Sequence, residues 1–93
     1  MKLKKHGAFL VNFVIDFANG DMSRFNFDLD YSGYVIEHFP LFQTEYPRLS
    51  ARFVNTIDAT YDGCSYMNDE AFRDAIADAV DDFMGTSPTS DIY

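Results

Sequence analysis

The sequence predicts an α+β fold in which an antiparallel β-hairpin, with or without a third strand, packs against two or three helices. Three patterns indicate this class. Two strand-like runs flank an Asn-Gly turn over residues 9–31, residues 49–61 carry an apolar repeat of four, and residues 68–85 have the spacing of an amphipathic helix. Strands followed by helices are typical of α+β domains.

The hairpin is predicted from the residues on either side of the Asn-Gly-Asp sequence at 19–21. The first run, Phe9–Ala18, is rich in β-branched and aromatic residues, which favour strands. In the second run, residues 24–31, every second side chain is large and apolar: Phe25, Phe27, Leu29 and Tyr31. Asn-Gly suits the positive φ angles of a type I′ hairpin turn. The phenylalanine faces of both strands are expected to form one wall of the core, covered by the C-terminal helix.

The second strand is expected to end at Ser32-Gly33. Tyr34–Phe39 then predicts a short helix that Pro40 stops, because the residue before a proline disfavours helical geometry. Residues 41–46 are expected to be irregular.

A repeat of four favours a helix from Arg48 to Tyr61, with Pro47 in its first turn. The apolar members of this repeat are Leu49, Phe53, Ile57 and Tyr61. The alternative is a third strand over Phe53–Ile57, because this stretch has high β content. In either case Gly63 ends the segment.

The stretch Asn68–Gly85 predicts a helix with one acidic face. Asn68 is a good N-cap type, and Gly85 followed by Pro88 marks the C-terminal end. One face is apolar: Phe72, Ile76, Ala79, Val80 and Phe83. The opposite face is acidic: Glu70, Asp74, Asp78, Asp81 and Asp82. Arg73 is the one cation of the segment.

This acidic face costs the helix stability. Three like-charge pairs four residues apart, Glu70/Asp74, Asp74/Asp78 and Asp78/Asp82, together cost about 1 kcal/mol. A place where local rules are broken is a candidate functional site. Two interpretations stay open: the face offers carboxylates to a basic partner, or it is a solvated face that keeps the protein soluble.

Length and charge bound the classes of function. Ninety-three residues suit one domain, which we expect over residues 1–85 with a short mobile tail at 86–93. The net charge is −8, and all of it falls in residues 53–93. This sign argues against direct binding of nucleic acid. A single cysteine and the lack of a membrane-length apolar run predict a cytoplasmic protein that does not enter membranes.

The stretch Asp58–Asp69 resembles an EF-hand calcium loop. The resemblance places four side-chain ligands at loop positions one, three, five and twelve: Asp58, Thr60, Asp62 and Asp69. Gly63 would supply the turn at position six, and a helix follows, as in the family. Thr60 departs from the usual acid or amide, and Asp69 replaces the long bidentate Glu. The resemblance therefore implies weak binding of a divalent ion, and the alternative is an ordinary loop between helices.

No other pattern predicts catalysis or a cofactor. His6 and His38 are far apart in the sequence, and Cys64 has no identifiable histidine partner. Asp28 and Asp30 are explained by a solvated strand face. The sequence has no Gly-rich phosphate loop, CxxC pair or HExxH stretch. We therefore expect a protein that is not an enzyme and needs no cofactor.

The leading hypothesis is an inhibitor that mimics nucleic acid. Five acids from Glu70 to Asp82 span about 18 Å of helix, which approaches the charge spacing of one DNA strand. The expected partner is a basic, nucleic-acid-binding protein such as a nuclease. In size and acidity the chain is similar to the small inhibitors that phages and mobile elements direct at CRISPR nucleases or restriction enzymes. The alternative is an interaction or homodimerisation module that uses its six tyrosines.

Overall fold

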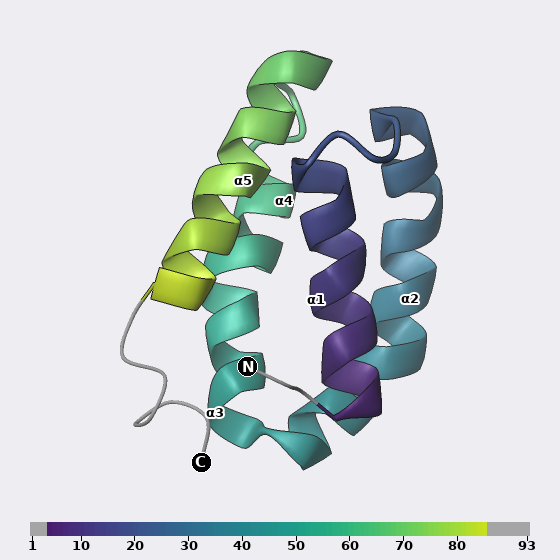
Figure 1. The fold of residues 1–93 in the computed structure, drawn as a ribbon, viewed down its shortest axis with the longest axis vertical. Helices are drawn as coiled ribbons and strands as arrows, with labels where there is room; N and C mark the ends of the chain where they lie inside the picture. Colours follow the sequence, from purple (N-terminus) through teal and green to yellow (C-terminus); the bar gives the residue numbers. More distant parts are fainter. Residues whose placement is uncertain (1–3, 86–93) are drawn as a thin grey trace.

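The structure is a computed structural model that describes residues 4–85, and helices account for 85% of this part (Figure 1). The described residues contain no strand, so the expected α+β class and its hairpin are wrong. The chain instead forms a small all-helical globule. Its elements follow in the order α1 (Lys5–Ala18), α2 (Arg24–Glu45), α3 (Pro47–Phe53), η1 (Val54–Asp58), α4 (Ala59–Gly63) and α5 (Asp69–Gly85).

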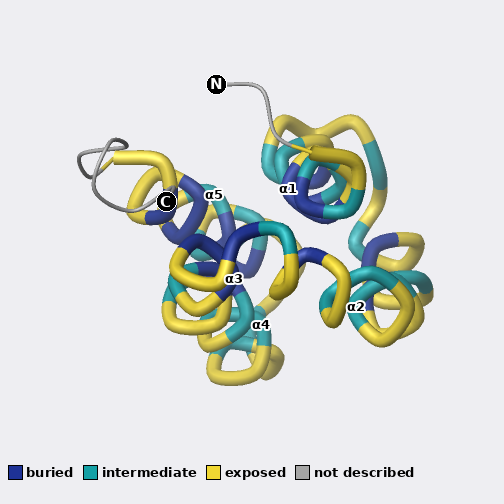
Figure 2. The backbone as a smooth tube through the Cα atoms, turned by 90° about the horizontal axis from the view of Figure 1, so that it is seen from below, coloured by how far each residue is buried: buried dark blue, intermediate teal, exposed yellow. Residues whose placement is uncertain are grey.

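The helices run alternately up and down around one core. The segments α3, η1 and α4 follow one another without a break and act as a single long helix. Helix α1 packs on α2 and α5, α2 packs on α3, and η1 and α4 pack on α5. Seen from below, these four bodies stand at the corners of a square, with buried backbone turned inward (Figure 2). Helices α2 and α5 therefore lie on opposite corners.

The first expected strand, Phe9–Ala18, belongs to α1. Its buried residues follow helical spacing: Gly7, Leu10, Val11, Val14 and Phe17. Phe13 and Ile15 are partly buried against the same core, so apolar side chains surround most of the helix. A segment that is apolar nearly all round fits both a period of two and a period of 3.6. Alternation therefore could not distinguish a strand from a helix here.

The Asn-Gly signal does mark a turn, but it is the end of a helix. Gly20 has a φ of 87°, while Asn19 keeps a helical φ of −81°. The Gly20 amide donates to the Phe17 carbonyl at 3.0 Å, and the Asp21 amide donates to the Asp16 carbonyl at 2.9 Å. These two bonds are those of a Schellman motif. The turn therefore leads into a second helix.

The second expected strand, residues 24–31, is the start of α2. Phe27 and Tyr31 face the core, whereas Phe25 and Leu29 face solvent. Ser23 caps the start of α2, and its hydroxyl accepts the amide of Asn26 at 3.2 Å. The helix continues through Gly33 and Pro40 to Glu45. Residues 34–39 are thus helical as predicted, but the expected break at Ser32-Gly33, the stop at Pro40 and the irregular stretch from residue 41 are wrong.

The helix expected over 48–61 is confirmed, because the chain is helical from Pro47 to Gly63, and the alternative third strand is wrong. Its middle, η1, is a π-helical turn. Phe53 and Ile57 are both fully buried, and Tyr61 is partly buried against the same core. The repeat of four thus keeps one side of this long helix on the core.

The C-terminal helix is confirmed in its start and its apolar face, whereas the left-handed C-cap expected at Gly85 is wrong. All five residues of its predicted apolar face are buried in α5. The Asn68 side chain accepts the Ala71 amide at 2.8 Å, as expected of an N-cap. Gly85 lies within the helix, and among the described glycines only Gly20 has a positive φ. The expected mobile tail, residues 86–93, lies outside the described residues.

Phenylalanine dominates the core where the helices meet. Five phenylalanine side chains are fully buried: Phe17, Phe27, Phe42, Phe53 and Phe72. The rings of Phe17 and Phe27 stack with centroids 4.1 Å apart, which joins α1 to α2, and Phe72 approaches both from α5. Among the helices that the structure describes, none has the length and apolar character needed to cross a bilayer.

Candidate acidic interface

The acidic ridge is the outer face of α5, formed by Glu70, Asp74, Asp78, Asp81 and Asp82. All five residues are exposed. At about 100° per residue they fall within an arc of roughly 120° that is centred opposite the buried face. Within residues 4–85 none of these carboxylates forms an ion pair. The predicted ridge is therefore present as a continuous strip of negative charge.

The one cation of α5 points away from this ridge. Arg73 donates from Nε to the Phe17 carbonyl at 3.0 Å and from its terminal nitrogen to the Met22 carbonyl at 2.7 Å. Its guanidinium also lies 4.7 Å from the centre of the Phe17 ring. These contacts tie α5 to the C-terminal end of α1. The charge of Arg73 is thus used in packing and not in neutralising the acids.

Two other arginines limit the extent of the ridge. Arg52 donates to the main-chain carbonyl of Asp82 at 2.8 Å, which places a positive group beside the C-terminal end of α5. Arg24 lies 3.4 Å from a carboxylate oxygen of Asp69 and 3.4 Å from one of Asp28. Asp69, in the first turn of α5, is therefore not part of the ridge. The strongest negative potential is expected around Asp74 and Asp78.

The residues of the EF-hand resemblance are helical and do not form a calcium loop. Asp58 ends η1 and accepts the hydroxyl of Tyr31 at 2.8 Å. Thr60 and Asp62 lie in α4, and Asp69 begins α5. In the part of the chain that the structure describes, no three His, Cys, Asp or Glu side chains are grouped so as to hold a metal ion. The ligand geometry that the resemblance implies is absent from residues 58–69.

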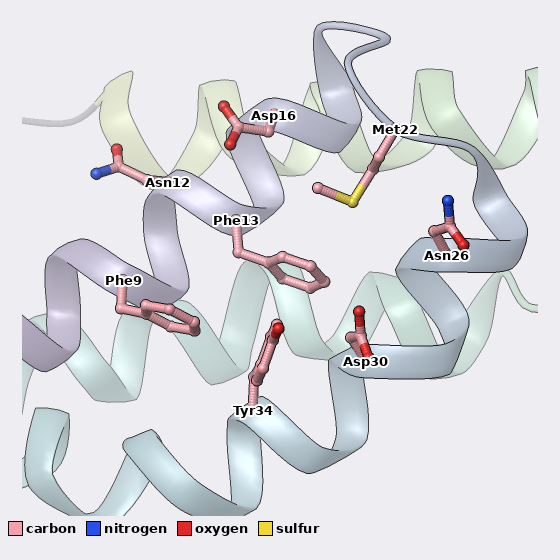
Figure 3. A pocket seen from close by; sticks show the side chains of 8 residues that line it. All are labelled: Phe9, Asn12, Phe13, Asp16, Met22, Asn26, Asp30 and Tyr34. Carbon is pink, nitrogen blue, oxygen red and sulfur yellow. The ribbon is translucent and has the colours of Figure 1, made fainter.

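A groove between α1 and α2 was not predicted from the sequence. It has a volume of about 490 Å³ (Figure 3). Helix α1 contributes Asn12 and Asp16 to its rim, and α2 contributes Asn26 and Asp30. The remaining lining is aromatic or apolar: Phe9, Phe13, Met22 and Tyr34. Each helix thus supplies one amide and one carboxylate four residues apart, a signal that becomes visible only if both segments are read as helices.

The two histidines, which are far apart in the sequence, meet in the structure. Nδ1 of His6 lies 2.9 Å from Nδ1 of His38, so one ring donates a hydrogen bond to the other. The His38 ring also stacks on Phe9 with centroids 4.2 Å apart. The carboxylate of Glu45 accepts the amides of His6 at 3.3 Å and Gly7 at 3.0 Å. This cluster joins the start of α1 to α2, which is a structural role.

No family model, no curated protein and no solved structure matches the chain. The candidate sites are therefore distinguished by their chemistry. The ridge offers carboxylates to solvent, while Cys64, half-buried and free, has no histidine contact among the described residues. The chemistry of the acidic ridge on α5 suits the binding of cationic groups.

Proposed function

We propose that the protein is a non-enzymatic binding protein whose acidic ridge occupies a basic, nucleic-acid-binding groove on a partner. The observation that supports this proposal is the ridge itself: five exposed carboxylates on one helix face, none in an ion pair within residues 4–85. A helix that only covers a core gains stability by mixing lysines into such a face. The retained repulsion is better explained by a use for the charge.

The spacing of the charges suits a groove that binds phosphates. From Glu70 to Asp82 the helix axis spans about 18 Å, which gives one charge per roughly 4.5 Å against 3.4 Å in one DNA strand. The α5 backbone holds these carboxylates on a rigid element that the phenylalanine core supports. A rigid array loses less entropy on binding than a flexible acidic tail would.

We propose a nuclease or a related nucleic-acid enzyme as the partner. Such proteins carry grooves lined with Lys and Arg, and a rigid acidic helix competes for them directly. Inhibitors of CRISPR nucleases or restriction enzymes from phages and mobile elements are the class that this chain is similar to in size and acidity. A cytoplasmic location fits this role and fits the single cysteine.

The proposal is tested by capturing partners from a host lysate on the immobilised protein. A ridge variant carries Asp74, Asp78, Asp81 and Asp82 changed to Asn. A second ridge variant carries only Asp74 and Asp78 changed to Asn, and its control changes Asp21 and Asp62 to Asn, which are exposed and give the same net charge with an intact ridge. Mimicry predicts that the control retains the partner and the ridge variants lose it.

Competition with nucleic acid tests whether the ridge occupies a nucleic-acid-binding groove of the partner. Excess duplex DNA or RNA should release the captured partner from the wild-type protein, and release should become easier as salt concentration rises. If the ridge variants capture the same proteins at undiminished yield, or if nucleic acid releases none of them, mimicry by the ridge is wrong.

A further inference from the structure

The outer face of α2 carries a stripe of large apolar side chains. Phe25, Leu29 and Ile36 are 73%, 68% and 77% exposed. At about 100° per residue they fall within a narrow arc that also holds Gly33 and Pro40, opposite the buried face of the helix. Isolated exposed apolar residues are ordinary, but three aligned on one helix face mark an interaction surface. We call this surface the α2 stripe.

The groove between α1 and α2 runs along one edge of the α2 stripe. Asn26 and Asp30 line the groove (Figure 3). At about 100° per residue they lie next to the stripe on the surface of α2. The carboxylates of Asp16 and Asp30 make no hydrogen bond or ion pair within residues 4–85. The rings of Phe13 and Tyr34 line the same groove. A groove that combines carboxylates with aromatic rings suits the side chain of a lysine or arginine.

Acidic residues border the α2 stripe on the side of the groove. Asp30 and Glu37 lie along this edge, and Asp28 lies along the other edge. Arg24 is the only Lys or Arg of α2. It pairs with Asp28 at 3.4 Å, donates to the carbonyls of Met67 and Ser65, and stacks over the Phe72 ring at 4.2 Å. The face therefore has an apolar centre and, beside the groove, a negative border that no Lys or Arg of α2 balances.

We infer that the α2 stripe docks an amphipathic helix of a partner protein, whose apolar side chains cover Phe25, Leu29 and Ile36 and whose lysines or arginines enter the groove. Charge complementarity selects this occupant. A second copy of the chain carries the same net charge of −8 and would bring one acidic border against another. The open space around Gly33, where no atom lies within 4 Å of an added Cβ, lets another helix approach closely.

This inference is independent of the acidic ridge, because α2 and α5 occupy opposite corners of the bundle (Figure 2). Both surfaces favour basic groups, yet only the α2 stripe needs apolar contacts. Affinity for the ridge is expected to fall steeply with salt, whereas affinity for the stripe should keep a component that salt does not remove.

The test uses a synthetic helical peptide with a leucine face bordered by lysines, titrated by calorimetry at moderate salt. Changing both Leu29 and Ile36 to Gln should weaken binding by about tenfold or more, since each side chain buries apolar area in the complex. Changing Asp16 and Asp30 to Asn should weaken binding and reduce its salt dependence. The four-residue ridge variant should bind the peptide like the wild type, so failure of one surface does not imply failure of the other.

Two control peptides and one further measurement complete the test. A peptide with its leucines scrambled off one face, and a peptide with Glu in place of Lys, should both bind at least about tenfold more weakly. Equal binding of the scrambled peptide, or unchanged binding by the Leu29/Ile36 variant, overturns the inference. Sedimentation decides the competing occupant: a dimer that the same variant converts to monomer would show that a second copy covers the stripe.

Discussion

The hydroxyl of Tyr31 donates a 2.8 Å hydrogen bond to the carboxylate of Asp58, which joins the middle of α2 to the end of η1. The Tyr31 ring also stacks on Tyr61 with centroids 3.9 Å apart. A hydrogen bond to a charged acceptor is worth about 1.5–3 kcal/mol, and partial exposure of Asp58 reduces this value. We expect Tyr31→Phe to lower the free energy of unfolding by about 1–2 kcal/mol in a urea titration. Tyr66→Phe, at an exposed position, should leave it nearly unchanged.

The same contact predicts a loss of stability at high pH. Burial, and then the hydrogen bond to Asp58, raise the pKa of Tyr31 well above its ordinary value of 10.0. The fold therefore favours the neutral phenol, so this contribution is complete below pH 10 and is lost as pH rises above it. Each pH unit above 10 should cost about 1.4 kcal/mol. Melting temperatures across this range should fall less steeply for Tyr31→Phe than for the wild type, and parallel curves would contradict the assignment.

Two helical glycines should respond to alanine in opposite directions. A Cβ at Gly7 would lie 2.9 Å from two ring carbons of Phe42, which is fully buried and has little room to move. Gly7→Ala should therefore destabilise the protein by about 1–3 kcal/mol, despite the better helix propensity of alanine. Nothing lies within 4 Å of a Cβ at Gly33, so Gly33→Ala should stabilise by about 0.5–1 kcal/mol. Denaturant titrations of both variants measure the two changes in unfolding free energy. If Gly7→Ala also stabilised the protein, the close packing of α1 on α2 at Gly7 would be contradicted.

Neutralising the centre of the acidic ridge should stabilise the isolated protein. Asp78 lies four residues from both Asp74 and Asp82, so Asp78→Asn removes two repulsions worth about 0.2–0.5 kcal/mol each. Asp30→Asn is the matched control, because Asn26 and Tyr34 stand four residues to either side. Thermal melts at low salt should show a higher melting temperature for the first variant alone. Added salt should shrink the difference, since the repulsion is screened.

Arg73 should be poorly replaced by lysine. Its guanidinium reaches two carbonyls at once, those of Phe17 and Met22, and stacks on the Phe17 ring. A lysine ammonium lacks the planar fork that makes this arrangement possible. We expect Arg73→Lys to cost about 1–2 kcal/mol of unfolding free energy, whereas Lys5→Gln at an exposed position should change it by less than about 0.5 kcal/mol. If Arg73→Lys changed the unfolding free energy as little as Lys5→Gln does, the positive charge at position 73 would be sufficient without the planar guanidinium.

Helix α5 could be predicted from the sequence because its pattern of apolar and acidic residues fits a helix and does not fit a strand. Its apolar residues occupy a single face, its acids the opposite face, and Asn68 caps its start. Local preference and tertiary burial agree there. The acidic ridge was predictable for the same reason, since charges on the solvent face of a correctly predicted helix need no knowledge of the rest of the fold.

Helix α2 could not be predicted in the same way, because it is apolar on two faces. Phe27 and Tyr31, four residues apart, face the core, while Phe25 and Leu29, also four apart, face solvent. Two such sets offset by two residues produce the strict alternation of a strand. The exposed pair made the helix resemble a strand, and together with Ile36 it forms the α2 stripe. The groove and the pair of histidines depend on how α1 meets α2, which no local pattern contains.

The π-helical turn η1 has a consequence for the length of the chain. Side chains four residues apart drift by about 40° per step around an ordinary α-helix, so a run of such steps would carry Tyr61 away from Tyr31. The wider turn, closed by bonds from residue i to i+5, takes up this drift by accommodating one surplus residue. Removing a single residue between Val54 and Asp58 should therefore convert η1 into an ordinary α-helical turn and leave the two halves of the protein in phase, whereas removing one residue from the regular turns of α3 should rotate α4 and α5 by about 100° relative to α1 and α2.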